Sequence, residues 1–189
     1  GANLRWKPER IPEALLSSAK VVVCQCEIRP DATERALQVG RESGALTILN
    51  PAPFTDQFRP ETLRYVDALV PNESEFSGLL SSLESARELA VSPEEVAGLS
   101  DDDFRLRCEA MPVPTVIVTL GEEGGYLSSP SGQGRYRPQR GIQAIDTVGA
   151  GDSFVGALAA AKARGADWPA AVVFATKVAG LAVQRKGSA

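Results

Sequence analysis

The amino-acid sequence predicts an α/β fold with a doubly wound, mostly parallel sheet and helices on both faces. Short runs of β-branched and aliphatic residues alternate along the chain with stretches of helical pattern, and units of this length are typical of parallel strands joined by crossover helices. Asn50, Asn72 and Thr119 each stand where such a run ends, which is where ligands bind in sheets of this kind. A length of 189 residues with 43% hydrophobic side chains is enough for one core, so residues 1–189 are interpreted as a single domain.

The first half of the chain contains three expected strands and two expected helices. The strands are the apolar runs at residues 20–24, 46–49 and 65–70. The first is a continuous β-branched run, so we expect it to be buried on both faces of the sheet. A helix over about residues 31–43 is expected to end at Gly44, because glycine readily adopts the left-handed conformation that follows many helices. A second helix should run from Asn72 to roughly Leu80.

The second half is expected to contain a fourth strand, a hairpin and two less regular segments. The strand is formed by residues 116–119, and the hairpin should follow at residues 124–127. Residues 81–103 are rich in Ser, Glu and Asp, and we expect a surface insertion with one or two helical turns that begin near Pro93. Residues 128–140 contain several Gly and Pro and are expected to form a turn-rich connection.

Composition excludes several classes of function. The net charge of −4 and the pI near 5 argue against nucleic acid or an anionic membrane as the main partner. The chain has no histidine, which excludes Ser-His-Asp catalysis and histidine-ligated metal sites. Its cysteines, Cys24, Cys26 and Cys108, lack the Cys-x-x-Cys spacing of a redox motif, so we expect buried, reduced thiols in a cytoplasmic protein.

The most informative segment is residues 146–153, DTVGAGDS, which leads into an alanine-rich apolar run. Gly149, Ala150 and Gly151 leave the backbone uncovered where a helix begins, so the first N–H groups of that helix can hold an anion. Asp152 would repel a phosphate there, and its expected role is to take a proton from a hydroxyl that attacks the phosphate. The alternative is that Asp152 only complements the helix dipole. The chain contains neither a Walker loop nor a dinucleotide fingerprint.

This segment resembles the signature Asp-Thr-x-Gly-Ala-Gly-Asp of the ribokinase group of carbohydrate kinases, the PfkB fold. Four more segments resemble that family in the same order: NPAP at residues 50–53, PNESE at 71–75, VTLG at 118–121 and RKGSA at 185–189. The resemblance implies a ribokinase-like fold and an ATP-dependent sugar kinase. NPAP and RKGSA favour ribose, phosphorylated at its 5-hydroxyl to ribose 5-phosphate.

The resemblance assigns roles around the transferred phosphate. It makes Asp152 the catalytic base that also contacts the sugar, and residues 149–151 the anion hole for the γ-phosphate. Asn72 and Glu75 match a pair that positions Mg²⁺ and phosphate, with Glu75 reaching the metal through water. The alternative for this pair is a helix N-cap followed by an acidic first turn.

The resemblance also assigns contacts to ATP and to the sugar. The residues that it places against ATP are Asn72, Thr119, Gly121, Gly124, Gly151 and Thr176. An ordinary glycine-containing turn is the alternative for the loop that follows Thr119. Thr176 has the alternative of a buried threonine that hydrogen-bonds its own helix. Glu27 matches a sugar-contacting glutamate, although a carboxylate at a strand end is commonly just solvated.

A potassium site is implied as well, formed by one carboxylate and several backbone carbonyls. Its expected ligands are Asp146, Val148, Ala182, Arg185 and Gly187. An ion held by them would tie the loop before Gly149 to the segment after the last helix and so stiffen the anion hole.

The matching pattern begins inside the family's chain, so the N-terminal strands and the β-lid over the sugar are expected to be missing, which exposes strand edges. The isolated chain is therefore expected to be inactive as a sugar kinase, whereas the full-length parent is expected to form a homodimer through that lid. Two alternatives stay open. One is another kinase of the group, of the fructokinase or nucleoside kinase type, and the other is a non-catalytic chain that binds nucleotide or pairs with a kinase subunit.

Overall fold

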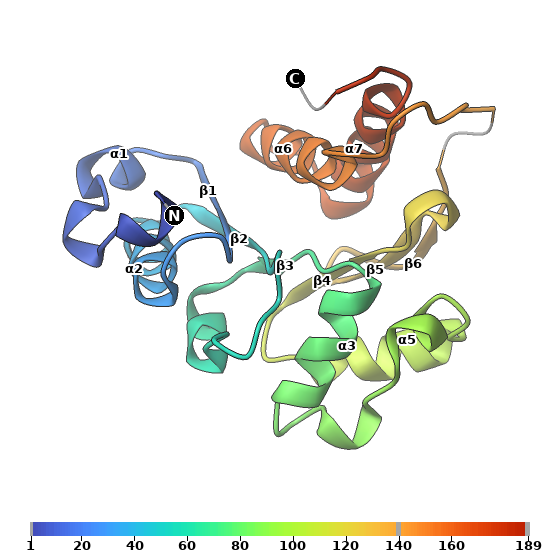
Figure 1. Ribbon diagram of the computed structural model, residues 1–189, viewed down its shortest axis with the longest axis horizontal. Coiled ribbons are helices and arrows are strands. Elements are labelled where there is room, and N and C mark those ends of the chain that lie inside the picture. Colours follow the sequence, from blue (N-terminus) through green and yellow to red (C-terminus); the bar gives the residue numbers. More distant parts are fainter. Residues whose placement is uncertain (1, 139–140, 188–189) are drawn as a thin grey trace.

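A computed structural model describes residues 2–138 and 141–187 of the chain, which are built around one sheet (Figure 1). Its strands are β1 (Val21–Gln25), β2 (Leu46–Asn50), β3 (Ala68–Leu69), β4 (Thr115–Thr119), β5 (Gly125–Ser129) and β6 (Gly132–Tyr136). Within the described residues the strands lie side by side in sequence order. The first four pair in parallel, and the last two pair antiparallel. The mostly parallel sheet predicted from the sequence is confirmed.

Helices cover both faces of this sheet, as predicted (Figure 1). On one face lie α2 (Pro30–Glu42), α3 (Glu73–Ser82) and α5 (Asp101–Glu109), and on the other lie α6 (Ala150–Ala163) and α7 (Trp168–Ala182). The shorter helices are α1 (Glu13–Ser17), α4 (Pro93–Val96) and the 3₁₀ turns η1 (Asn3–Arg5), η2 (Pro8–Arg10), η3 (Pro60–Tyr65), η4 (Arg87–Leu89) and η5 (Gly121–Glu123). Across residues 2–138 and 141–187, no helix combines the length and the apolar character needed to span a membrane.

The strands contribute side chains to two separate cores, one on each face of the sheet, because successive residues of a strand point to opposite faces. In β4, Val116 and Val118 pack on the side of α3 and α5, in the same cluster as Phe104. Ile117, between them, packs on the side of α6 and α7 together with Leu158. The two layers of helices therefore depend on the same six strands, and a residue's place in the alternation decides which layer it contacts.

Several predicted element boundaries agree with the structure. The helix predicted over residues 31–43 is α2, and Gly44 follows it with φ +83°, the conformation expected after a helix end. Asn72 caps the start of α3. The hairpin predicted at residues 124–127 is formed by the antiparallel pairing of β4 with β5.

Strand β1 is less buried than its sequence predicts. Val22 is buried, but Val23 is 40% exposed. Val21 and Val23 point to the face covered by α6 and α7, and Val21 packs against that core. The prediction of a strand buried on both faces is wrong here, because β1 lies at the edge of the described sheet and the helical cover stops short of Val23.

Two other predicted segments differ in secondary structure. The strand predicted at residues 65–70 is reduced to β3, because the preceding residues form the 3₁₀ helix η3. The turn-rich connection predicted at residues 128–140 contains β6, which pairs antiparallel with β5. Its glycines suggested turns, but pairing with β5 along the whole of β6 holds the segment in an extended conformation. Residues 139–140 lie outside the described residues.

Residues 81–103, predicted as a surface insertion, are only partly at the surface. Helix α4 begins at Pro93, as expected. Leu83, Ala86 and Val96, however, are buried in the core cluster on the side of α3 and α5. The polar composition of the segment describes its outer side, while these apolar side chains anchor it to the rest of the fold.

The aromatic stack at the centre of this core generates a test of the fold. Phe104 is fully buried, and its ring stacks on Tyr126 with 4.9 Å between the centroids. We expect Phe104→Ala to lower the free energy of unfolding by about 3–5 kcal/mol, because it removes the ring and leaves a cavity. Leu106→Ala, on the same helix but at a 51% exposed position, should change it by less than about 0.5 kcal/mol. Urea denaturation of the two variants measures this, and equal losses would contradict the packing described.

Candidate active site

The start of α6 is open to solvent. Gly149 precedes the helix with φ +76°, a left-handed conformation that favours glycine, and no side chain caps the helix. The Ala150 N–H donates to the Thr147 carbonyl at 3.2 Å. The N–H groups of Gly151 and Asp152 belong to the first helical turn and have no intrahelical acceptor, so they are the groups best placed to hold an anion.

The carboxylate of Asp152 is exposed and is held by a residue that the sequence analysis did not assign to the site. Gln25, the last residue of β1, donates from Nε2 to Asp152 Oδ1 at 2.8 Å. The same nitrogen donates to Asn50 Oδ1 at 3.0 Å. Gln25 could have been found from its place at a strand end, two residues before Glu27. The contact to Asp152 spans 127 positions of the sequence and is visible only in the fold.

Asn72 and Glu75 form a reciprocal cap at the start of α3. Asn72 Oδ1 accepts from the Glu75 N–H at 2.9 Å, and Glu75 Oε2 accepts from the Asn72 N–H at 3.0 Å. The alternative that the sequence left open, an N-cap with an acidic first turn, is therefore realised in the geometry. The Asn72 side chain also donates to Glu75 Oε1 at 3.0 Å.

Glu75 combines this capping role with burial at the start of α3. It is only 6% exposed, and burial raises the pKa of its carboxyl, opposed by the hydrogen bond from the Asn72 backbone. Both oxygens already accept hydrogen bonds from Asn72, which leaves little room for direct metal contact. In the part of the chain that the structure describes, no group of three or more Asp, Glu, Cys or His side chains could hold a metal ion.

The loop after β4 lies beside Asn72. The Thr119 N–H donates to the Pro71 carbonyl at 2.9 Å, which joins the end of β4 to the residue before Asn72. Gly121 and Gly124 both have positive φ, and a Cβ on Gly124 would lie 2.1 Å from the Tyr136 carbonyl oxygen. The positive φ angles of the two glycines are explained by an ordinary glycine-containing turn, the alternative that the sequence left open. The loop lies at the same edge of the sheet as Asn72.

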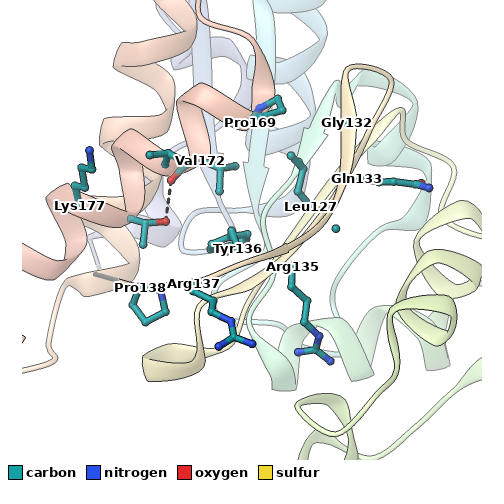
Figure 2. Close-up of a pocket in the computed structure, with 13 residues that line it drawn as sticks. Leu127, Gly132, Gln133, Arg135, Tyr136, Arg137, Pro138, Pro169, Val172 and Lys177 are labelled. Carbon is teal, nitrogen blue, oxygen red and sulfur yellow. Dashed lines mark hydrogen bonds between the residues drawn. The ribbon is translucent and has the colours of Figure 1, made fainter. Parts of the chain in front are cut away.

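Thr176 lies apart from these groups, on a groove between β6 and α7. The groove has a volume of about 460 Å³, and Figure 2 shows Tyr136, Pro138, Val172 and Lys177 around it. Thr176 Oγ1 donates to the Val172 carbonyl at 2.8 Å, so the threonine hydrogen-bonds its own helix as the alternative predicted, but it is half-buried, not buried. The wall formed by β6 is tied to α6 because the Tyr136 ring stacks on Phe154, with 6.0 Å between the centroids.

The remaining predicted residues form two separate groups. Glu27 is exposed, and its Oε2 accepts from Asn3 Nδ2 at 3.3 Å. Among the expected potassium ligands, two contact Asp146, whose carboxylate accepts from the Val148 N–H and the Gly187 N–H, both at 3.0 Å. These two bonds lower the pKa of Asp146.

Further backbone bonds join the same two segments. The N–H groups of Ile145 and Asp146 donate to the Val183 carbonyl at 2.7 and 3.1 Å. The Ala182 carbonyl accepts from the Arg185 N–H at 3.2 Å in the turn that follows α7. The loop before Gly149 is therefore held against the segment after α7 by the chain's own hydrogen bonds.

The cysteines contribute no reactive thiol to this site. All three are free; Cys108 is buried, and Cys24 and Cys26 are half-buried and pack against the same core. Burial raises the pKa of Cys24 to about 12, with a smaller contribution from Cys26. It likewise raises the pKa of Cys26 to about 11 and that of Cys108 to about 12. Thiols with such values stay protonated and unreactive at neutral pH.

Comparison with known proteins supports this fold and shows the family of the chain. The model of the pfkB family carbohydrate kinases matches residues 1–189, and the chain belongs to this family. It is 32% identical to a ribokinase of Schizosaccharomyces pombe over 94% of the chain, and 37% identical to a ribokinase of Mus musculus over 84%. The structure of Arabidopsis thaliana ribokinase complexed with ribose and ATP superimposes with a TM-score of 0.78, at 27% identity over the whole chain.

The chain matches only part of the length of each of these relatives. The chain covers 53% of the S. pombe protein, 47% of the mouse protein and 58% of the Arabidopsis chain. It therefore spans about half the length of the curated relatives that it matches.

The hydrogen bonds of Asp146 generate a pH-dependent test. Because its folded pKa lies below the ordinary 3.8, the stability that it contributes is present above that value and is lost as the pH falls through the folded pKa. We expect Asp146→Asn to lower the thermal unfolding midpoint at about pH 7, and this difference to shrink as the pH falls below 3.8. The exposed Asp56→Asn controls for the loss of one charge. The hydrogen bonding described would be contradicted if Asp146→Asn lowered the unfolding midpoint by the same amount at neutral pH and at a pH below 3.8.

Proposed function

We propose that this chain carries the phosphate-binding groups and the catalytic base of an ATP-dependent sugar kinase. The full-length gene product would transfer the γ-phosphate of ATP to the 5-hydroxyl of ribose. The observation that carries this proposal is a fixed carboxylate, that of Asp152, in the first turn of a helix whose start is uncapped. A base and an anion site side by side are what phosphoryl transfer to an alcohol requires.

The proposed reaction assigns a role to each of these groups. Asp152 accepts the proton of the attacking hydroxyl while that oxygen forms its bond to the γ-phosphorus. The bond between the γ-phosphorus and the bridging oxygen breaks, and ADP leaves. The N–H groups of Gly151 and Asp152, at the positive end of the α6 dipole, stabilise the negative charge on the transferring phosphoryl group. Gly149 contributes by turning the chain so that these groups face outward.

Two ions belong to the proposal. Mg²⁺ would be positioned by Glu75 through water, which fits a carboxylate whose oxygens are both engaged by Asn72. It would neutralise charge on the phosphates of ATP. K⁺ would take the carbonyls of Val148, Ala182, Arg185 and Gly187 with Asp146, and the hydrogen bonds that already join these segments support such a site.

The choice of ribose rests on the relatives. Those of S. pombe and mouse are named ribokinase, and the Arabidopsis structure contains ribose and ATP. In this chain, Thr119, Gly121, Gly124 and the groove at Thr176 are proposed to contact ATP, and Glu27 the sugar. We further propose a cytoplasmic location, in keeping with three free thiols, and a homodimeric full-length protein.

Replacing the proposed base tests this function. In the full-length gene product, Asp152→Asn should lower kcat for ribose by roughly 10²–10⁴-fold to a small residual rate and leave the affinity for ATP within a few-fold, because the amide keeps the shape but accepts no proton. Rates are measured with a panel of sugars and nucleosides, with ATP, Mg²⁺ and K⁺. More than about a hundredth of the wild-type kcat would refute the base, since general-base catalysis contributes roughly 10²–10⁴-fold.

A matched control comes from another helix. Asp102 also lies in the first turn of a helix, α5, and is exposed there. Asp102→Asn should keep the wild-type kcat, because complementing a helix dipole contributes only to stability. If both variants lost the same activity, Asp152 would have no special role.

A further inference from the structure

The residue that holds Asp152 lies on the sheet face that α6 covers. Gln25 alternates with Val21 and Val23 along β1, and the parallel register pairs it with Asn50 of β2. Asn50 in turn lies two residues after Ile48, which packs in the core beneath α6 and α7. Gln25 and Asn50 are thus the outermost side chains of two neighbouring strands on the face towards Asp152.

The orientation of both amides follows from a single backbone carbonyl. The Val70 carbonyl only accepts, so the Asn50 group that meets it at 2.8 Å must be Nδ2. Asn50 Oδ1 therefore faces Gln25, and the Gln25 group that meets this oxygen at 3.0 Å must be its donor, Nε2. The second hydrogen of Nε2 is then directed at Asp152 Oδ1, at 2.8 Å.

The chain of hydrogen bonds continues to the capping carboxylate. Asn50 Nδ2 lies 3.5 Å from Glu75 Oε2, the longest link in the series. Asn50 and Glu75 are 8% and 6% exposed, so this end of the network is fixed by the fold, whereas Asp152 is exposed. A side chain that is free to rotate in water must be ordered before it can act, and Gln25 supplies the contact that orders it.

We propose that Gln25 is a positioning residue for phosphoryl transfer: it holds one oxygen of the Asp152 carboxylate from the end of β1 and links it through Asn50 to Glu75. This rests on the proposed function of Asp152. Because Gln25 Nε2 contacts Oδ1, the Oδ2 atom is left to meet the attacking hydroxyl. This series of hydrogen bonds fixes the position of the proposed base, Asp152, relative to Glu75, the residue proposed to position magnesium.

The kinetic test uses two changes in the full-length gene product. Gln25→Ala removes the donor, and Gln25→Glu keeps the size of the side chain but presents an oxygen where the nitrogen stood. Each should lower kcat by about 10- to 100-fold, the value of a hydrogen bond to a charged group, with the KM for ATP changed less than about twofold. In an Asp152→Asn background Gln25→Ala should cause no further loss, because its effect passes through the missing carboxylate.

A control and a structural readout complete the test. Gln38 donates to the Glu42 carboxylate at 2.9 Å on the exposed side of α2, and Gln38→Ala should leave kcat unchanged. In ¹⁵N spectra, Asp152→Ala should shift the side-chain amide signals of Gln25. Wild-type kcat in Gln25→Glu, or an equal loss with and without Asp152, would overturn the proposal. So would unchanged amide signals, and this last result is independent of whether Asp152 is the base.

Discussion

The parallel pairing of strands β1 to β4 determines where the candidate site residues lie. Parallel strands end at one edge of the sheet, so Gln25, Asn50 and Thr119 are brought to the same edge. Asn72 joins them through the bond between Thr119 and Pro71. The helices α6 and α7 pack on one face of these strands, which brings the start of α6 over the strand ends, where Gln25 contacts Asp152.

Much of this arrangement could be predicted from the sequence, because the signals are local. Apolar runs followed by Asn50 or Thr119 mark strand ends, and Gly44 marks the end of a helix. Residues 146–153 predict their own proposed role, since small residues and an acid at a helix start are typical of an anion site beside a base. Where local signals were ambiguous, as in the glycine-rich residues of β6, pairing with a neighbouring strand decided the structure.

The interactions that hold the site could not be predicted in the same way. Gln25 looked like a polar residue at a strand end, and its partner Asp152 lies 127 positions away. Val23 looked buried, but burial on the α6 face depends on how far the helices extend over an edge strand. Both outcomes follow from tertiary packing. For Asn72 and Glu75, the sequence could not separate a structural role from a functional one, because the same capping box fits both the helix cap and the proposed functional role.

We propose that the strand ends and the start of α6 form one phosphate-binding surface. Hydrogen exchange of this 189-residue chain, with and without magnesium-ATP, tests whether nucleotide binds there. We expect slower exchange in peptides that contain Gly151 and Asp152 and in those that contain Gly121 and Gly124, while α1 and α2 stay unchanged. Protection confined to α1 and α2, or none at saturating nucleotide, would contradict it.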